Sequence, residues 1–136
     1  MIERVFESYK AAVLAKDVEA FVSLYAPDVR VFDLWGQWSY EGRAAQRKLA
    51  ADWFGSLGTE SVAVSFDELR ITVSGDLAIA NAFTTYRGIS AEGKELRSMQ
   101  NRLTWGLKQQ GGEWKIIHEH TSAPIDSQAK AILKRF

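Results

Sequence analysis

Residues 61–74 read SVAVSFDELRITVS, and this stretch decides the fold. On both sides of Asp67-Glu68 the apolar side chains alternate with polar ones, which is the period of a β-strand with one buried face. The apolar positions are even-numbered before Asp67-Glu68 and odd-numbered after it. A β-bulge or a sharp bend produces such a phase flip, because one extra residue reverses the face that each side chain occupies. The stretch therefore predicts a long, bent strand in a strongly curved sheet.

The segments around this strand complete the prediction of an α+β fold. After it, turn residues separate three strand-like runs, at 77–89, 95–108 and 113–122. Before it, apolar residues recur at helical spacing in 2–13, 17–25 and 45–57, with one short β-prone run at 29–34. Helices that precede strands, rather than alternate with them, favour a curved antiparallel sheet packed on three helices in the N-terminal half. A short helix beginning at Asp126 and ending at Phe136 is also expected.

Composition excludes several classes of function. The 136 residues contain 17 Lys and Arg against 17 Asp and Glu, so the basic excess typical of nucleic-acid binding is missing. Cysteine is absent, which excludes disulfides, thiolate catalysis and iron–sulfur clusters. No apolar run approaches the ~20 residues that cross a bilayer. We expect a single cytoplasmic domain over residues 1–136, with no cofactor and neither a nucleic acid nor a membrane as partner.

Five polar residues interrupt the predicted apolar faces and are the candidate catalytic residues: Tyr9, Asp33, Asn101, His118 and His120. A polar group is costly to bury without a partner, so its presence on an apolar face suggests a function. Three of the five also have a purely structural interpretation. Tyr9 could be a core phenol, Asp33 a cap or turn residue, and Asn101 a residue that satisfies a backbone group at a bulge.

The last hairpin suggests which of these residues share a face. If residues 109–112 form a four-residue loop, Leu103 lies opposite His118 and Asn101 lies opposite His120. The same register places Arg102 opposite Glu119 on the other face, which is a favourable cross-strand ion pair. We therefore expect both histidines to share a face with Asn101.

The two histidines allow two interpretations. His118 and His120 could be metal ligands, with Asp33 as a third. A bare His-x-His pair is weak support for a metal, so we favour two imidazoles that line a pocket and shuttle protons, and we expect no metal. The residues expected to form the apolar ligand-binding walls of this pocket are Trp35, Trp53, Met99, Leu103 and Trp105.

Three segments resemble a known superfamily. Residues 6–13 (FESYKAAV) and 16–29 (KDVEAFVSLYAPDV) resemble the opening of the nuclear transport factor 2-like superfamily, which includes ketosteroid isomerases, scytalone dehydratase and SnoaL-like polyketide cyclases. Residues 112–124 (GEWKIIHEHTSAP) are similar to the ending of one SnoaL-like branch, and a related ending occurs in the association domain of calcium/calmodulin-dependent kinases. The resemblance implies a cystatin-like cone, with a curved antiparallel sheet, three helices and a pocket at the wide end. It also implies dimerisation through the outer face of the sheet.

The resemblance to ketosteroid isomerase implies roles for individual residues. Tyr9 matches the tyrosine that stabilises the enolate oxygen, Asp33 matches the general base, and Asn101 falls about where that enzyme has a protonated aspartic acid. His118 and His120 replace apolar cavity residues. This departure makes the expected pocket more polar and closer to the sites of SnoaL-like cyclases and dehydratases.

These observations predict a small-molecule pocket protein that acts on a small, partly apolar carbonyl compound by acid–base catalysis. Asp33 is expected to remove a proton next to the carbonyl, Tyr9 and Asn101 to stabilise the enolate, and His120 or His118 to return the proton. The alternative is a non-catalytic ligand-binding or protein-association domain with a small or filled pocket and structural histidines. A homodimer is expected because the predicted outer face, carrying Ile117, Thr121 and Thr104, is less polar than a free surface usually is.

Overall fold

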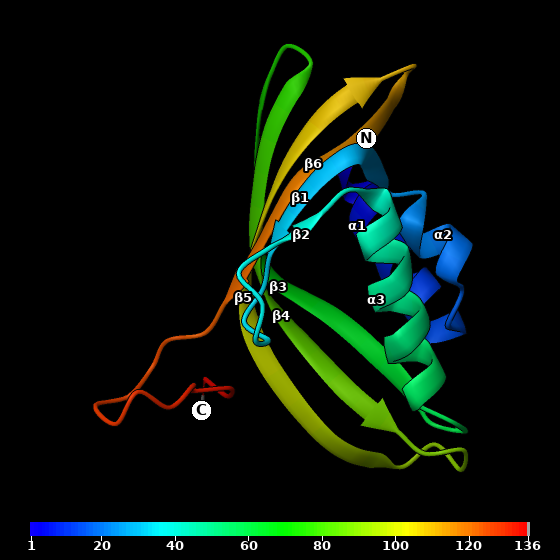
Figure 1. The fold of residues 1–136 in the computed structure, drawn as a ribbon, viewed down its shortest axis with the longest axis vertical. Helices are drawn as coiled ribbons and strands as arrows, with labels where there is room; N and C mark the ends of the chain where they lie inside the picture. The colour runs from blue at the N-terminus through cyan, green and yellow to red at the C-terminus, as the bar shows by residue number, and fades with distance from the viewer. Residues whose placement is uncertain (136) are drawn as a thin grey trace.

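The computed structural model describes residues 1–135, so the expected helix end at Phe136 lies outside the described residues. The chain forms, in order, α1 (Ile2–Ala15), α2 (Val18–Val22), β1 (Tyr25–Phe32), β2 (Tyr40–Glu41), α3 (Arg43–Ser56), β3 (Ser61–Ser74), β4 (Leu77–Ile89), β5 (Glu95–Gln110) and β6 (Glu113–Ser122). Figure 1 shows the strands as one curved sheet, with the helices on its concave side. The predicted α+β architecture is confirmed.

The sheet has six strands in the order β2-β1-β6-β5-β4-β3. β3, β4, β5 and β6 pair antiparallel in sequence, and β2 pairs antiparallel with β1. The one difference from the expected antiparallel sheet is that β1 pairs with β6 in parallel. This pairing brings the end of β1, and with it Asp33, beside the end of β6.

The bend expected at Asp67-Glu68 is present. The register of β3 against β4 shifts between Asp67 and Arg70, and Glu68 has the left-handed φ of 56°. Val62 and Val64 before the shift belong to the hydrophobic core, and Ile71 after it packs against that core, which is the predicted change from even to odd positions. The extra residue therefore keeps one apolar face directed inward while the strand curves.

The helices form where the apolar spacing predicts them. The stripe on α1 is buried in the core, and α1 ends at Ala15, followed by the cap residue Lys16, whose backbone is left-handed. Asp17 caps α2 by accepting a hydrogen bond from the backbone N–H of Ala20. α2 stops at Val22, earlier than expected, because the chain already enters β1 at Tyr25.

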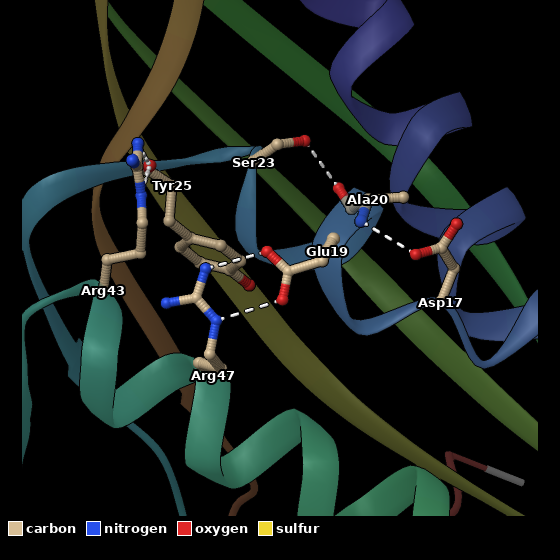
Figure 2. Close-up of polar contacts among 7 residues, drawn as sticks. All are labelled: Asp17, Glu19, Ala20, Ser23, Tyr25, Arg43 and Arg47. Carbon is tan, nitrogen blue, oxygen red and sulfur yellow. Dashed lines mark hydrogen bonds and ion pairs between the residues drawn. The ribbon is translucent and has the colours of Figure 1, made fainter.

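Two arginines of α3 make polar contacts with α2 and with the start of β1 (Figure 2). The Arg47 guanidinium donates to both carboxylate oxygens of Glu19, at 3.1 and 2.9 Å. The Arg43 side chain donates to the backbone carbonyl of Tyr25, where β1 begins. The Arg47–Glu19 pair is exposed and adds at most about 1 kcal/mol. These contacts connect α3 to α2 through Arg47 and to the start of β1 through Arg43.

The predicted register of the last hairpin is wrong. The loop between β5 and β6 is only Gly111-Gly112, because both residues adopt the positive φ that a two-residue turn requires. This shortening moves the register by two residues, which preserves the face. A further shift between Gly106 and Leu107, where Ile117 is the extra residue on β6, reverses it. Thr104 therefore lies opposite His120, and Gly106 lies opposite His118.

The expected C-terminal helix is replaced by an extended segment, residues 123–135. The Asp126 carboxylate accepts hydrogen bonds from the backbone N–H groups of Gln128 and Lys130, so it caps a turn instead of a helix. The segment then returns to β5, where the Gln100 N–H donates to the Leu133 carbonyl at 2.6 Å. In Figure 1 it lies on the side of the sheet away from the helices. Within residues 1–135 no helix is long and apolar enough to cross a membrane.

Candidate functional site

A cavity of about 550 Å³ lies between the concave face of the sheet and the helices. Its walls include six of the ten residues predicted from the sequence, namely Tyr9, Asp33, Trp35, Trp53, Met99 and Asn101. Tyr9 comes from α1, Asp33 from the residue after β1, and Asn101 from β5. The curved sheet thus brings together three polar groups that are far apart in the sequence.

The two histidines lie on the opposite face of the sheet. His118 Nδ1 is 2.7 Å from the backbone carbonyl oxygen of Arg30, and the exposed His120 ring stands edge-on to Phe32. The expectation that they share a face with Asn101 is wrong, because the extra residue Ile117 reverses the face of β6. No group of three or more potential metal-ligating side chains occurs in residues 1–135, so Asp33 does not join the histidines in such a cluster.

Two of the expected apolar walls belong to the core instead. Leu103 and Trp105 are buried on the inner face of β5 but do not border the cavity. The Trp105 ring packs against the Phe6 ring, with their centroids 4.2 Å apart. Thr121, expected on the outer face, lines the cavity, which again follows from the shifted register.

A pair of phenols forms one wall of the cavity. The hydroxyl oxygens of Tyr9 and Tyr86 are 3.1 Å apart, which is a hydrogen bond between α1 and β4. Burial raises the pKa of Tyr86 to about 12 and raises the pKa of Tyr9 well above its ordinary value. Both phenols are therefore neutral hydrogen-bond donors at any physiological pH. Tyr86 is not among the residues predicted from the sequence, although its place in the inward-facing alternation of 77–89 could have revealed it.

Glu119 is a buried carboxyl that sequence reasoning placed on the wrong face. Only 8% of the residue is exposed, and its Oε1 accepts hydrogen bonds from Tyr25 Oη at 2.7 Å and Trp105 Nε1 at 2.8 Å. Burial raises the pKa of Glu119, and the nearby Asp33 charge raises it further, although the two hydrogen bonds oppose this. The residue lines the cavity and favours the protonated state more strongly than an exposed glutamate does.

Two buried amides also line the cavity. The carbonyl oxygens of Asn101 and Gln46 are buried, and neither has a hydrogen-bond partner within residues 1–135. Asn101 lies opposite Thr84 on β4, two residues from Tyr86, so it shares the inner face of the sheet with that phenol. Gln46 lies on the buried side of α3, where no sequence pattern singled it out.

Asp33 lies at the mouth of the cavity. Its Oδ1 accepts a hydrogen bond from the Trp35 N–H at 2.9 Å, so the turn role considered for Asp33 is present as well. The residue is half-buried and borders the cavity together with Trp35 and Tyr40. Two carboxyls thus border one cavity, Asp33 in a polar turn and Glu119 in the interior.

This arrangement can carry out acid–base chemistry on a bound organic molecule. Neutral phenol and amide N–H donors can stabilise negative charge on a ligand oxygen. Carboxyl groups in different surroundings can respectively accept and donate a proton. Trp53, Phe21 and Val62 give the rest of the cavity an apolar lining.

Comparison with known proteins identifies the family. No functionally curated protein matches the sequence. Among solved structures, a nuclear transport factor 2-like protein of unknown function from Pseudomonas putida is 29% identical, with a TM-score of 0.85 over 99% of this chain and 93% of its own. A nuclear transport factor 2-like protein with a cystatin-like fold from Novosphingobium aromaticivorans is 18% identical, with a TM-score of 0.77 over 94% of this chain and 83% of its own. A family model described as the SnoaL-like domain matches residues 2–126. The chain is therefore a member of the SnoaL-like domain family and has the nuclear transport factor 2-like, cystatin-like fold.

Proposed function

We propose that the protein binds a small, partly apolar carbonyl compound in its cavity and acts on it by acid–base catalysis. Asp33 removes a proton from the carbon next to the carbonyl. Tyr9 and Asn101 donate hydrogen bonds to the enolate oxygen that forms, each contributing roughly 3 kcal/mol to stabilisation of the transition state. Isomerisation, dehydration and aldol cyclisation all begin with such a step.

The observation that carries this proposal is the Tyr9–Tyr86 hydrogen bond beside Asn101 in the cavity wall. Two hydroxyls joined by one hydrogen bond retain one O–H that can donate to a ligand. The apolar surroundings raise the cost of leaving that donor unpaired, and they strengthen its interaction with a developing charge. The wall is therefore suited to an oxygen that becomes negative during a reaction.

Glu119 takes the role of returning the proton. The histidines are on the other face of the sheet, whereas Glu119 borders the cavity and its raised pKa favours the protonated form. Its Oε1 is occupied by Tyr25 and Trp105, while no hydrogen bond from residues 1–135 reaches Oε2. Asp33 accepts a proton from one carbon, Glu119 gives a proton to another, and both carboxyls then re-equilibrate with water.

The size of the cavity supports a ligand-binding role. Small-molecule sites usually measure about 300–1,000 Å³, and this cavity measures about 550 Å³. The non-catalytic alternative was expected to have a pocket too small or too filled for a substrate. One observation still favours it, since the Asp33 Oδ1 is engaged in a turn.

Exchange of α-protons on a simple ketone tests the catalytic proposal. We expect the protein to accelerate deuterium incorporation into 2-tetralone in D2O, followed by proton NMR. Asp33→Asn should reduce this acceleration by about 10²-fold or more while binding persists in a thermal-shift assay. Asp52→Asn, on the exposed side of α3, is the matched control and should react like wild type. Binding without any exchange in the wild-type protein would favour the ligand-binding alternative.

We also propose that the protein is a homodimer formed through the outer face of the sheet. Ile79 and Leu77 on β4 project from that face with 51% and 48% of their surfaces exposed. Ile117 and Thr104 lie on the same face, beside His118. Exposed isoleucine and leucine side chains on a sheet face favour association with a second copy.

A further inference from the structure

One arginine, Arg97, borders the same cavity as Asp33. Arg97 lies on the inner face of β5, directly opposite Gly88 on β4. A Cβ at position 88 would lie 3.3 Å from the Arg97 Cζ and 3.5 Å from Nη1. Because glycine has no side chain, the guanidinium lies across β4 where a larger residue would displace it. Arg97 and Gly88 both border the cavity.

The Arg97 guanidinium retains donors that the protein does not use. Its Nη2 donates to Glu60 Oε1 at 2.5 Å, and within residues 1–135 the guanidinium makes no other hydrogen bond. Nε and Nη1 therefore remain open, and 61% of the side chain is exposed at the cavity rim. Among the described residues that line the cavity, Arg97 is the only basic one, whereas the acidic ones are Asp33 and Glu119.

The position of Arg97 along β5 sets its distance from Asn101. Arg97, Met99 and Asn101 occupy successive inward positions of the strand. Four residues of extended strand separate the Cα atoms of Arg97 and Asn101 by about 13 Å. The apolar side chains of Met99, Trp53 and Leu57 border the cavity as well. The cavity thus offers hydrogen-bond donors in its interior, an apolar lining and a cation at its rim.

We propose that Arg97 is a specificity-determining residue that binds an anionic group, so that the ligand is an elongated monoanion. Its carbonyl end meets the Tyr9–Asn101 wall, its apolar body lies against Met99 and Trp53, and its carboxylate or sulfonate meets Arg97. A guanidinium presents its N–H groups in a planar fork that matches such anions. This inference rests on the proposed function and names the class of compound that the cavity accepts.

Two fluorescent probes that differ by one charged group test the inference. The anionic probe is 8-anilinonaphthalene-1-sulfonate, and the neutral probe is N-phenyl-1-naphthylamine, which lacks the sulfonate. We expect Arg97→Gln to weaken binding of the anionic probe by about tenfold or more, because a charge-assisted contact is lost. The Kd of the neutral probe should stay unchanged. Added salt should weaken binding of the anionic probe to the wild-type protein and should have less effect on its binding to Arg97→Gln.

Two further variants separate a local contact from a general charge effect. Glu60→Gln removes the carboxylate that occupies Arg97, so it should tighten binding of the anionic probe. Arg87→Gln makes the same charge change on the outer face, where Arg87 pairs with Glu95, and should leave both probes at their wild-type affinities. The proposal would be supported if the anionic probe binds more tightly to Glu60→Gln, more weakly to Arg97→Gln and equally well to Arg87→Gln.

The outcomes that contradict each idea are distinct. If both probes bind wild type and Arg97→Gln changes neither Kd, the anion site is wrong while the small-molecule pocket stands. An equal effect of Arg87→Gln would also overturn the site, since net charge would then explain the result. If neither probe binds the folded wild-type protein, the proposed small-molecule pocket itself fails.

Discussion

The two carboxyls of the cavity differ in what surrounds them, and this difference could be predicted for one of them only. Asp33 stands at the end of a regular β-prone run, so its place beside a pocket followed from the alternation. Glu119 was assigned to the outer face together with Arg102. Tyr9 and Asn101 were located correctly because the helical and strand periods continue unbroken through them. Their roles in catalysis remain predictions.

Glu119 should make the stability of the protein depend on pH. Its pKa is raised in the folded state, so the folded protein binds more protons than the unfolded chain between pH 4.5 and the raised value. Stability therefore falls as pH rises through this window. Glu119→Gln keeps an oxygen that can accept from Tyr25 and Trp105, and it removes the ionisation. We expect the variant to be more stable than wild type above this window, because it avoids burying an ionised carboxylate.

Thermal melts from pH 4 to 8 measure this effect. Glu113→Gln, an exposed glutamate on the same strand, is the control and should follow the wild-type curve. Parallel curves for Glu119→Gln and wild type would contradict a buried, proton-holding carboxyl.

Two β-bulges decide what the strands present to the cavity, and the sequence revealed only one of them. At Asp67-Glu68 the apolar positions themselves change phase, so the pattern records the extra residue. At Ile117 the only trace is the consecutive pair Ile116-Ile117, because the residues that follow are polar on both faces. The assumption that β6 is a regular strand therefore placed the two histidines on the inner face and Glu119 and Thr121 on the outer face, which is the reverse of the structure. The loop at Gly111-Gly112 is also shorter than the four residues expected. Even the correct loop length would have given the register of β5 and β6 only as far as the bulge at Ile117.

The left-handed backbone at Glu68 allows a test of the first bulge. Only glycine adopts a φ of 56° without steric cost, and other residues lose roughly 1 kcal/mol there. Glu68→Gly and Glu68→Ala both remove the ion pair with Arg135, so they differ in backbone freedom alone. We expect the glycine variant to be more stable than the alanine variant by about 1 kcal/mol in urea unfolding. Equal stabilities would argue against the bulge geometry.

On the scale of the whole molecule, the helices cover one face of the sheet and leave most of the other free (Figure 1). The order of elements predicted this architecture, because helices that precede antiparallel strands have one face on which to pack. The family match and the solved relatives agree with it. The path of residues 123–135 could not be predicted, since it depends on pairing with an exposed stretch of β5.

A charge on the free face should disrupt the proposed dimer. Ile79→Glu introduces a carboxylate on the exposed outer face of β4, where two copies would bury it without a partner. We expect sedimentation at micromolar concentration to change from dimer to monomer, with binding of the neutral probe unaffected. Leu14→Glu introduces the same charge at an exposed leucine of α1, on the helix side of the sheet, and should remain dimeric. A monomeric wild-type protein would contradict the dimer.

The hydrogen bond from Trp105 to Glu119 couples an indole to the carboxyl of the cavity. Because indole emission responds to nearby charge, this tryptophan is a natural spectroscopic reporter for the interior of the protein. Replacing the four other tryptophans by phenylalanine would leave a single chromophore that detects proton uptake in the cavity without any added label.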